Sequence, residues 1–174
     1  TRGVRGAREL PAEAAEAMVD VLVRFIEIHE LKNDAMTWER LGELLEETNP
    51  LLIVTALEQF EKFRRGEPEL TLTLRPLLDH PEAGIREKAA RVVTQILGRY
   101  DVAEIPEAES LLSVLISLAR RDLDVPVRIA GTEALDGFPY ERVRSVIQEV
   151  ASSDPDQGVR YVAEKILLQH RQNE

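Results

Sequence analysis

The sequence predicts an all-α protein, an α-solenoid of stacked antiparallel helix pairs with about nine helices. First, apolar residues recur at helical spacing in nearly every segment, as Val159, Val162, Ile166 and Leu167 do in the stretch 154–167. Second, an aspartate, a short turn and an apolar residue followed by arginine begin this stretch, and the same order returns in 79–97 and 122–135. A helix pair that cannot bury its own apolar face stacks on its neighbours, which is why such a repeat indicates a solenoid.

Composition supports a folded chain and excludes several classes of protein. Of the 174 residues, 44% are hydrophobic and 31% charged, which is typical of a folded protein and not of a disordered one. The net charge of −10 disfavours general binding to nucleic-acid phosphates or anionic membranes. Because there is no cysteine, disulfides and thiolate metal sites are excluded.

Membrane insertion and compartment have separate signals. No apolar run approaches the roughly 18 residues that a membrane-spanning helix needs, so we expect no membrane insertion. The chain begins with Thr1 rather than Met, so we expect a processed product or a piece of a longer chain. Neither this start nor the lack of cysteine decides between a cytoplasmic and an exported protein.

The predicted organisation is a single solenoid domain over 11–170. Residues 1–10, with three arginines and two glycines, predict a flexible lead-in, and 171–174 a polar tail. The domain is expected to hold a leading helix over 11–31 and helix pairs over about 37–66, 68–99, 106–137 and 139–169.

Several single residues predict local structure. Asp154 is expected to cap the last helix, with Pro155 at its first position. Gly66 is expected to end a helix, and Gly131 to let two helices approach closely. The alternating run 70–74 is also compatible with a strand, but its helical surroundings favour a helix that Pro76 kinks or ends.

The repeated motif resembles that of the HEAT-repeat family, whose second helices typically open with Asp, a turn, Val-Arg and an Ala-rich face. The resemblance covers roughly residues 37–169. The arginines are 42 and 32 residues apart, so the period is irregular, and the first pair has Asn49 and Ile53 where Asp and Arg would stand. The first pair therefore resembles a capping repeat. The matching positions are Asp79 with Ile85-Arg86, Asp122 with Val127-Arg128, and Asp154 with Val159-Arg160.

We expect the aspartates and arginines of this motif to form a structural ladder beneath the turns, each arginine meeting an aspartate of its own or an adjacent repeat. The alternative is an anion site built from the three arginines. The ladder is favoured, since each arginine has an aspartate six or seven residues before it. Its expected members are Asp79, Arg86, Asp122, Arg128, Asp154 and Arg160.

The sequence offers no catalytic constellation. The three histidines are not within helical ligand spacing of one another, and no nucleophile elbow, phosphate loop or dinucleotide motif occurs. We therefore expect no catalysis, no cofactor and no metal. Trp38-x-x-Leu41-Gly42-x-x-Leu45 resembles the start of a tetratricopeptide repeat, but the pattern does not recur one period later, so we expect Trp38 to serve the core.

Charge predicts a binding face. First helices are acidic, whereas second helices carry more cations, and in a HEAT-like solenoid the second helices form the concave side. A non-catalytic scaffold that binds a protein or peptide, with an acidic one favoured, is the main hypothesis. Alternatives are a nucleic-acid-binding module and a HEAT-like enzyme domain, since the resemblance extends to some DNA glycosylases and bilin lyases. The residues expected to be exposed on this face are Gln59, Lys62, Lys88, Arg91, Gln95, Thr132, Tyr161 and Lys165.

Overall fold

The structure, a computed structural model, describes residues 14, 17, 21, 24 and 35–172. The expected lead-in over 1–10, nearly all of the expected leading helix over 11–31, and positions 173 and 174 lie outside the described residues. The chain groups into two compact units, 1–56 and 57–174, within the range where one domain was expected. Each unit is therefore described by itself.

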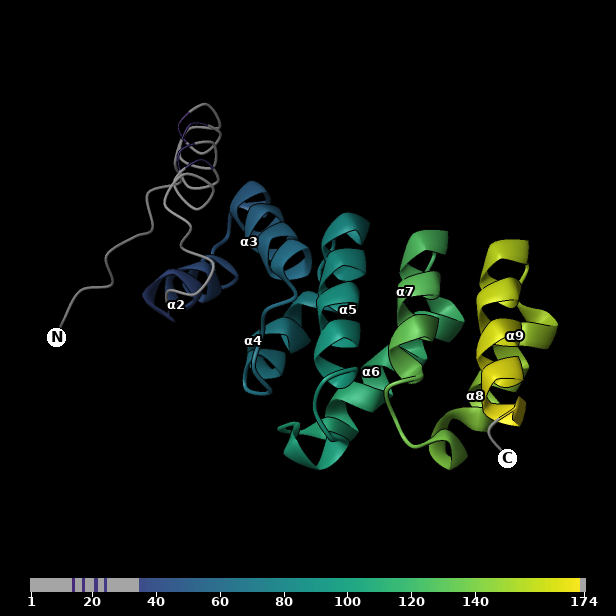
Figure 1. The fold of residues 1–174 in the computed structure, drawn as a ribbon. Coiled ribbons are helices and arrows are strands. Elements are labelled where there is room, and N and C mark those ends of the chain that lie inside the picture. Colours follow the sequence, from purple (N-terminus) through teal and green to yellow (C-terminus); the bar gives the residue numbers. More distant parts are fainter. Residues whose placement is uncertain (1–13, 15–16, 18–20, 22–23, 25–34, 173–174) are drawn as a thin grey trace, which may run out of the picture. The chain divides into compact units, whose positions relative to one another are not determined.

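The described range 35–172 holds eight α-helices, one short 3-10 helix and no strand, which confirms the all-α prediction (Figure 1). Among the described residues, no helix is both long and apolar enough to cross a membrane. The helices are α2 (Ala35–Leu44), α3 (Pro50–Phe63), α4 (Leu70–Leu77), α5 (Ala83–Leu97), η2 (Val102–Glu104), α6 (Ala108–Arg121), α7 (Val125–Leu135), α8 (Tyr140–Ser153) and α9 (Gln157–Gln172).

The first unit contains α2 and the beginning of α3. Leu41 and Leu45, one turn apart at the end of α2, are both buried, and Trp38 is half-buried one turn earlier. The Asn49 side chain accepts a hydrogen bond from the Leu51 amide at 3.0 Å, so it satisfies one of the unpaired amides that every helix start leaves. Asn49 therefore caps the N-terminus of α3.

The end of α3 corrects one expectation. Arg64, not Gly66, is the residue that leaves the helix in the left-handed conformation, with φ of 51°. The Arg65 amide donates to the Phe60 carbonyl at 3.1 Å, which closes the helix in a Schellman motif. Gly66, with φ of 130°, has a different role, because a Cβ there would lie 3.1 Å from Ile96 Cδ1. It lets the chain pass close to α5.

The second unit is a stack of three helix pairs, α4 with α5, α6 with α7, and α8 with α9. The second helices α5, α7 and α9 lie side by side, and α6 packs beside α8 in the first-helix layer (Figure 1). The run 70–74 is helical, and α4 ends just after Pro76, as expected for a proline that removes a backbone donor.

Gly131 in α7 lies where two helices are closest. A Cβ at this position would stand 2.9 Å from the Ala119 backbone nitrogen and 3.0 Å from Leu118 Cβ, both on α6. The predicted close approach is therefore confirmed, and the missing side chain is what allows α7 to pack this near to α6. Around it the apolar stripes of α6 and α7 are buried, including Leu115, Ala130 and Leu135.

The start of α9 differs from the prediction by two residues. The Asp156 carboxylate, rather than that of Asp154, accepts hydrogen bonds from the amides of Gly158 at 2.8 Å and Val159 at 3.2 Å. Pro155 belongs to the preceding turn, since α9 begins at Gln157. Because Asp156 caps α9, Asp154 does not serve as the cap and instead takes part in a contact between repeats.

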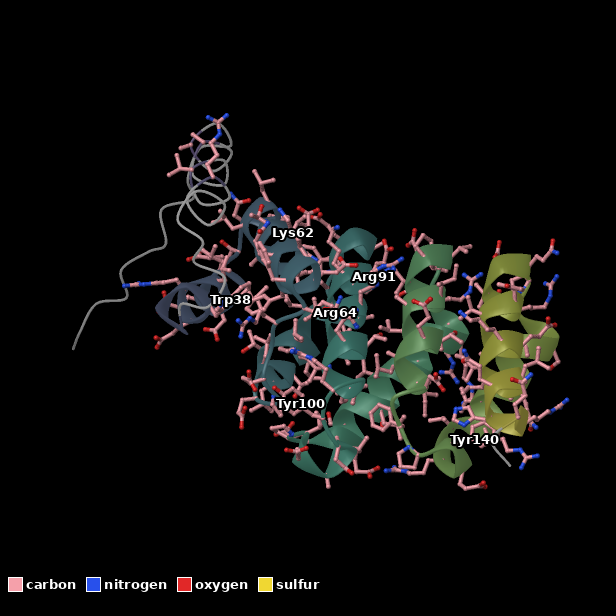
Figure 2. All side chains as sticks on the ribbon, in the orientation of Figure 1. Trp38, Lys62, Arg64, Arg91, Tyr100 and Tyr140 are labelled. Atoms are coloured by element: carbon pink, nitrogen blue, oxygen red, sulfur yellow. The ribbon has the colours of Figure 1, made fainter. Side chains whose placement is uncertain are left out.

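The other end of α9 is held by a histidine. His170 Nε2 lies 2.7 Å from Asp136 Oδ1, just after α7, and the ring stacks on Tyr140 at a centroid separation of 4.2 Å. Tyr140 is the first residue of α8 and is labelled in Figure 2. The contact ties the last helix to the two helices before it.

Candidate functional site

The row of second helices α5, α7 and α9, with the adjoining part of α3, is the surface on which binding residues were expected; we call it the second-helix face. Two of those residues are not exposed. Gln59 is 5% exposed and Thr132 is 0% exposed, so the expectation that they are available to a partner is wrong. Thr132 faces inward because α7 is the middle helix of the row, and its hydroxyl donates to the Arg128 carbonyl at 2.8 Å.

Gln95 contributes to structure more than to a free surface. Its side-chain amide donates to the Glu61 carbonyl at 3.1 Å and so joins α5 to the end of α3. The amide oxygens of Gln59 and Gln95 are both buried, with no hydrogen-bond partner among the described residues. Neither glutamine offers its oxygen to a ligand.

Two cations of the second-helix face are paired with carboxylates. Lys88 Nζ lies 3.0 Å from Glu58 Oε1, and Arg91 Nη2 lies 2.9 Å from Glu87 Oε1. Burial lowers the pKa of the Arg91 guanidinium. The hydrogen bond with Glu87 and the negative charges of Glu87, Glu133 and Glu61 outweigh this effect, so the pKa of Arg91 lies above its ordinary value. The face therefore carries both signs of charge rather than a basic patch.

Three charged residues occupy the same place in successive second helices. Arg91, Glu133 and Lys165 each follow the arginine of the repeated motif by five residues, so they form a row across α5, α7 and α9. We call it the charged row. Arg91 is labelled on α5 in Figure 2, and Lys62 lies on α3 with its ammonium 5.3 Å from the Phe63 ring centroid. Glu133 was not among the binding residues predicted from the sequence. Its spacing of five residues after Arg128, the same as that of Arg91 after Arg86, could have identified it.

Two arginines of the motif, Arg86 and Arg128, each contact an aspartate of the following repeat. Arg86 donates through Nε and Nη2 to the two carboxylate oxygens of Asp122, each at 2.8 Å. Arg128 makes the same two-pronged contact with Asp154, at 2.8 and 3.1 Å. Paired planar groups of this kind are strong and fix orientation as well as distance.

Each arginine is held in place by its own turn. Nη1 of Arg86 donates to the carbonyls of His80 and Pro81, at 2.8 and 2.9 Å. Nη1 of Arg128 donates to the carbonyls of Asp122 and Leu123, at 2.9 and 3.4 Å. The turn thus fixes the guanidinium through Nη1. The remaining donors of the guanidinium, Nε and Nη2, point to the following repeat.

Two expected members of the ladder have other partners. Asp79 contacts Arg75 at 2.6 Å on the surface and not Arg86. His80 stands at the corresponding place, because its Nδ1 accepts from the Glu82 amide as the Asp122 carboxylate does from the Asp124 amide. The expected position was one residue too early, since a match by residue type selects the aspartate and overlooks a histidine with the same acceptor role.

Arg160 does not pair with the Asp154 carboxylate, although the two belong to one turn. Its Nη1 donates to the backbone carbonyls of Asp154 and Pro155, at 2.6 and 3.0 Å. The Asp154 carboxylate is taken by Arg128 of the preceding repeat. Since carboxylates of this chain already occupy Arg86 and Arg128, the alternative of an anion site made by all three arginines is wrong.

Two hollows of about 350 and 200 Å³ lie along the edge where these contacts run. The larger is lined in part by His80, Arg86 and Asp122, and the smaller by Asp154 and Pro155. The two hollows arise from the repeated architecture, because each lies between one turn and the next. They are not part of the second-helix face.

The ladder carboxylates have altered acid–base behaviour. Burial raises the pKa of Asp154, but hydrogen bonds from Arg128 and from the Asp156 amide outweigh it, so the pKa lies below the ordinary value of 3.8. Asp122 is shifted in the same direction by Arg86 and the Asp124 amide, against its burial.

A lowered folded-state pKa predicts a pH-dependent contribution to stability. The Asp154 contribution is fully present above about pH 4, where the unfolded chain is ionised, and is lost as pH falls through the folded-state value. We therefore expect the gap in free energy of unfolding between wild type and Asp154→Asn to be wide at pH 7 and narrower at pH 3, as measured by urea denaturation. The surface variant Asp79→Asn should differ little from wild type at pH 7. A gap for Asp154→Asn that is constant with pH would contradict the prediction.

Comparisons with known proteins concern the fold. No protein-family model and no curated protein matches the sequence. An engineered protein of known structure matches with a TM-score of 0.61 and 22% identity, over 91% of this chain and 66% of its own length. A designed armadillo repeat protein matches with a TM-score of 0.62 and 18% identity, over 94% of this chain and 76% of the other.

A third structure is natural. The complex of CpcE and CpcF of phycocyanin lyase from Nostoc sp. PCC7120 matches with a TM-score of 0.65 and 18% identity, over 98% of this chain and 69% of the other chain. At these identities the likeness shows the fold alone. Within the described part of the chain, no three acidic or histidine side chains gather as a metal site would require. Together with the stacked helix pairs, the comparisons show that this chain is a helical-repeat α-solenoid.

Proposed function

We propose that this chain is a non-catalytic binding module of the HEAT type, and that it binds a protein or peptide through its second-helix face. The charged row of Arg91, Glu133 and Lys165 is the observation that carries the proposal. It repeats a charged side chain at one place on three neighbouring helices, which suits a partner that lies across them. The interhelix ladder supports the HEAT assignment, because it uses the Asp and Arg of the motif.

The partner's chemistry follows from the mixture of charges. Glu58 and Glu87 hold Lys88 and Arg91, so a purely acidic segment would meet carboxylates as well as cations. A segment with alternating signs, placed opposite Arg91, Glu133 and Lys165, fits better. Exposed pairs contribute only about 0 to 1 kcal/mol each, so these charges would set register and direction more than affinity.

The likeness to the phycocyanin lyase complex does not favour an enzyme over a binding module, because it concerns the fold alone. The net charge of −10 likewise disfavours the nucleic-acid alternative. Binding of a polypeptide is therefore the function that we propose.

The test exchanges charges without changing the net charge of the protein. Peptides would first be selected from a displayed random library against the wild-type chain. We expect the double variant Glu133→Lys, Lys165→Glu to weaken their binding about tenfold in fluorescence anisotropy, because it reverses two members of the charged row.

A matched control lies on the other layer of helices. Glu141→Lys with Arg144→Glu makes the same exchange on α8, where both side chains are exposed, and should alter affinity less than about twofold. Thermal unfolding of both variants would show that the folds are equally intact. The reverse pattern of losses would place the site on the first helices and overturn the proposal.

A further inference from the structure

The two hollows beside the ladder differ in how their first helices are joined. At the smaller hollow, Arg120 near the end of α6 forms an ion pair with Glu149 near the end of α8. Glu149 stands five residues before the ladder aspartate Asp154. The residue five before Asp122, which lines the larger hollow, is Ser117. A hydroxyl thus takes the place of the carboxylate in the larger hollow.

Arg121, the last residue of α6, lines the larger hollow and is exposed. Its guanidinium pairs with no carboxylate among the residues that the structure describes. The two carboxylates that line the same hollow already have cations of their own. Asp79 lies 2.6 Å from Arg75, and Asp122 lies 2.8 Å from Arg86. Arg121 therefore adds a positive charge that this part of the chain does not compensate.

Two further donors line the larger hollow. Because His80 Nδ1 accepts a hydrogen bond from the Glu82 amide at 3.1 Å, the neutral ring carries its proton on Nε2, away from the turn. Ser117 lies one helical turn before Arg121, so the two side chains share one face of α6. Neither the Ser117 hydroxyl nor Nε2 of His80 has a hydrogen-bond partner within the described part of the chain.

We propose that the larger hollow binds a phosphoryl group, held by the guanidinium of Arg121 and by hydrogen bonds from His80 and Ser117. A phosphoryl group presents three strong acceptor oxygens, which match the three donors, whereas a carboxylate presents two. Arginine also pairs with phosphate through two parallel hydrogen bonds. The hollow lies apart from the charged row, so the inference does not depend on the function proposed above.

The phosphoryl group could belong to a free phosphate ion or to a phosphorylated polypeptide, so the test uses both. Inorganic phosphate and a short neutral peptide with one phosphoserine would each be added to the isotope-labelled chain at constant ionic strength. We expect saturable shifts in the nuclear magnetic resonance signals of the Arg121 Nε–H group and the His80 ring. Tighter binding of the peptide would assign the site to a phosphorylated polypeptide, and tighter binding of the ion to free phosphate. Equal binding of acetate, or shifts centred on another surface, would overturn the proposal.

A carboxylate placed in the larger hollow should compete with the ligand. Ser117→Glu supplies one at the place that Glu149 holds in the smaller hollow, four residues before Arg121, where the two side chains can pair. We expect it to weaken phosphate binding about tenfold. Ser113→Glu adds the same charge one turn earlier at an exposed position of α6 and should weaken binding less than about twofold. Equal losses in the two variants would show a general effect of charge and overturn the proposal.

Removing the cation is the complementary test. Arg121→Gln should weaken phosphate binding about tenfold, whereas Arg171→Gln, an equal change of charge at an exposed position of α9, should leave it unchanged. Because Arg121 is exposed and has no ion-pair partner in the described range, thermal unfolding of Arg121→Gln should match that of wild type. Unchanged phosphate binding in Arg121→Gln would overturn the proposal.

Discussion

Replacing Arg128 by alanine is expected to lower the free energy of unfolding by about 3 to 5 kcal/mol. Arg128 and Asp154 are nearly enclosed, with side chains 8% and 4% exposed, and they share two hydrogen bonds. Without the guanidinium, the Asp154 carboxylate would remain buried with one amide donor, and the carbonyls of Asp122 and Leu123 would lose a donor as well. Urea denaturation followed by circular dichroism would measure the loss.

Replacing either of two other arginines should cost less stability than Arg128→Ala does. Arg160→Ala removes only hydrogen bonds to the backbone of its turn, so it should cost less, about 1 kcal/mol. Arg142→Ala removes an exposed ion pair with Glu109 and should cost under about 0.5 kcal/mol. The expected order is Arg128, then Arg160, then Arg142. Similar small losses for all three would show that the ladder does not stabilise the stack.

Replacing Gly131 by alanine is expected to destabilise the protein by about 2 to 3 kcal/mol, because the added methyl group overpacks the contact between α6 and α7. Its Cβ would stand 2.9 Å from the Ala119 nitrogen and 3.3 Å from the Leu118 carbonyl carbon. Both are backbone atoms of a helix and cannot rotate away as a side chain would. Chemical denaturation would measure the effect.

The matched control is Gly84→Ala in α5. Apart from the local backbone of α5 and the adjacent residues, no described atom lies within 4 Å of the Cβ that would be added there. Because alanine favours helix over glycine, this change should raise stability by about 0.5 kcal/mol. Losses of similar size at both glycines would mean that helix propensity, and not close approach, controls Gly131.

Much of the local structure could be predicted from the sequence. Helical spacing of apolar residues placed the helices over 35–172 within a few residues, because a helix must bury a stripe that repeats every 3.6 residues. The helix at 70–77 followed from its surroundings, although its alternation also fits a strand. Errors gathered at helix ends, where Arg64 and Asp156 took roles expected of Gly66 and Asp154.

The candidate site was harder to predict, because exposure depends on what neighbouring helices cover. Thr132 is polar and has the spacing of a surface residue, yet it lies in the middle helix of the row and is buried. Tyr161 was expected to be exposed and is 65% exposed, on a helix with one described neighbour in the row instead of two. No local pattern distinguishes a helix that is packed on both sides from one that is packed on a single side.

The sequence by itself determined the fold class and the residue types that join the repeats, since apolar periodicity and the Asp and Arg motif are local properties. Only the tertiary structure decided which partners meet. Arg86 reaches Asp122 across 36 residues and Arg128 reaches Asp154 across 26, whereas the nearer carboxylates are passed over. The physical reason is geometric: each turn fixes its own arginine through backbone carbonyls, so the guanidinium fork can meet only the carboxylate that stacking brings to the neighbouring turn.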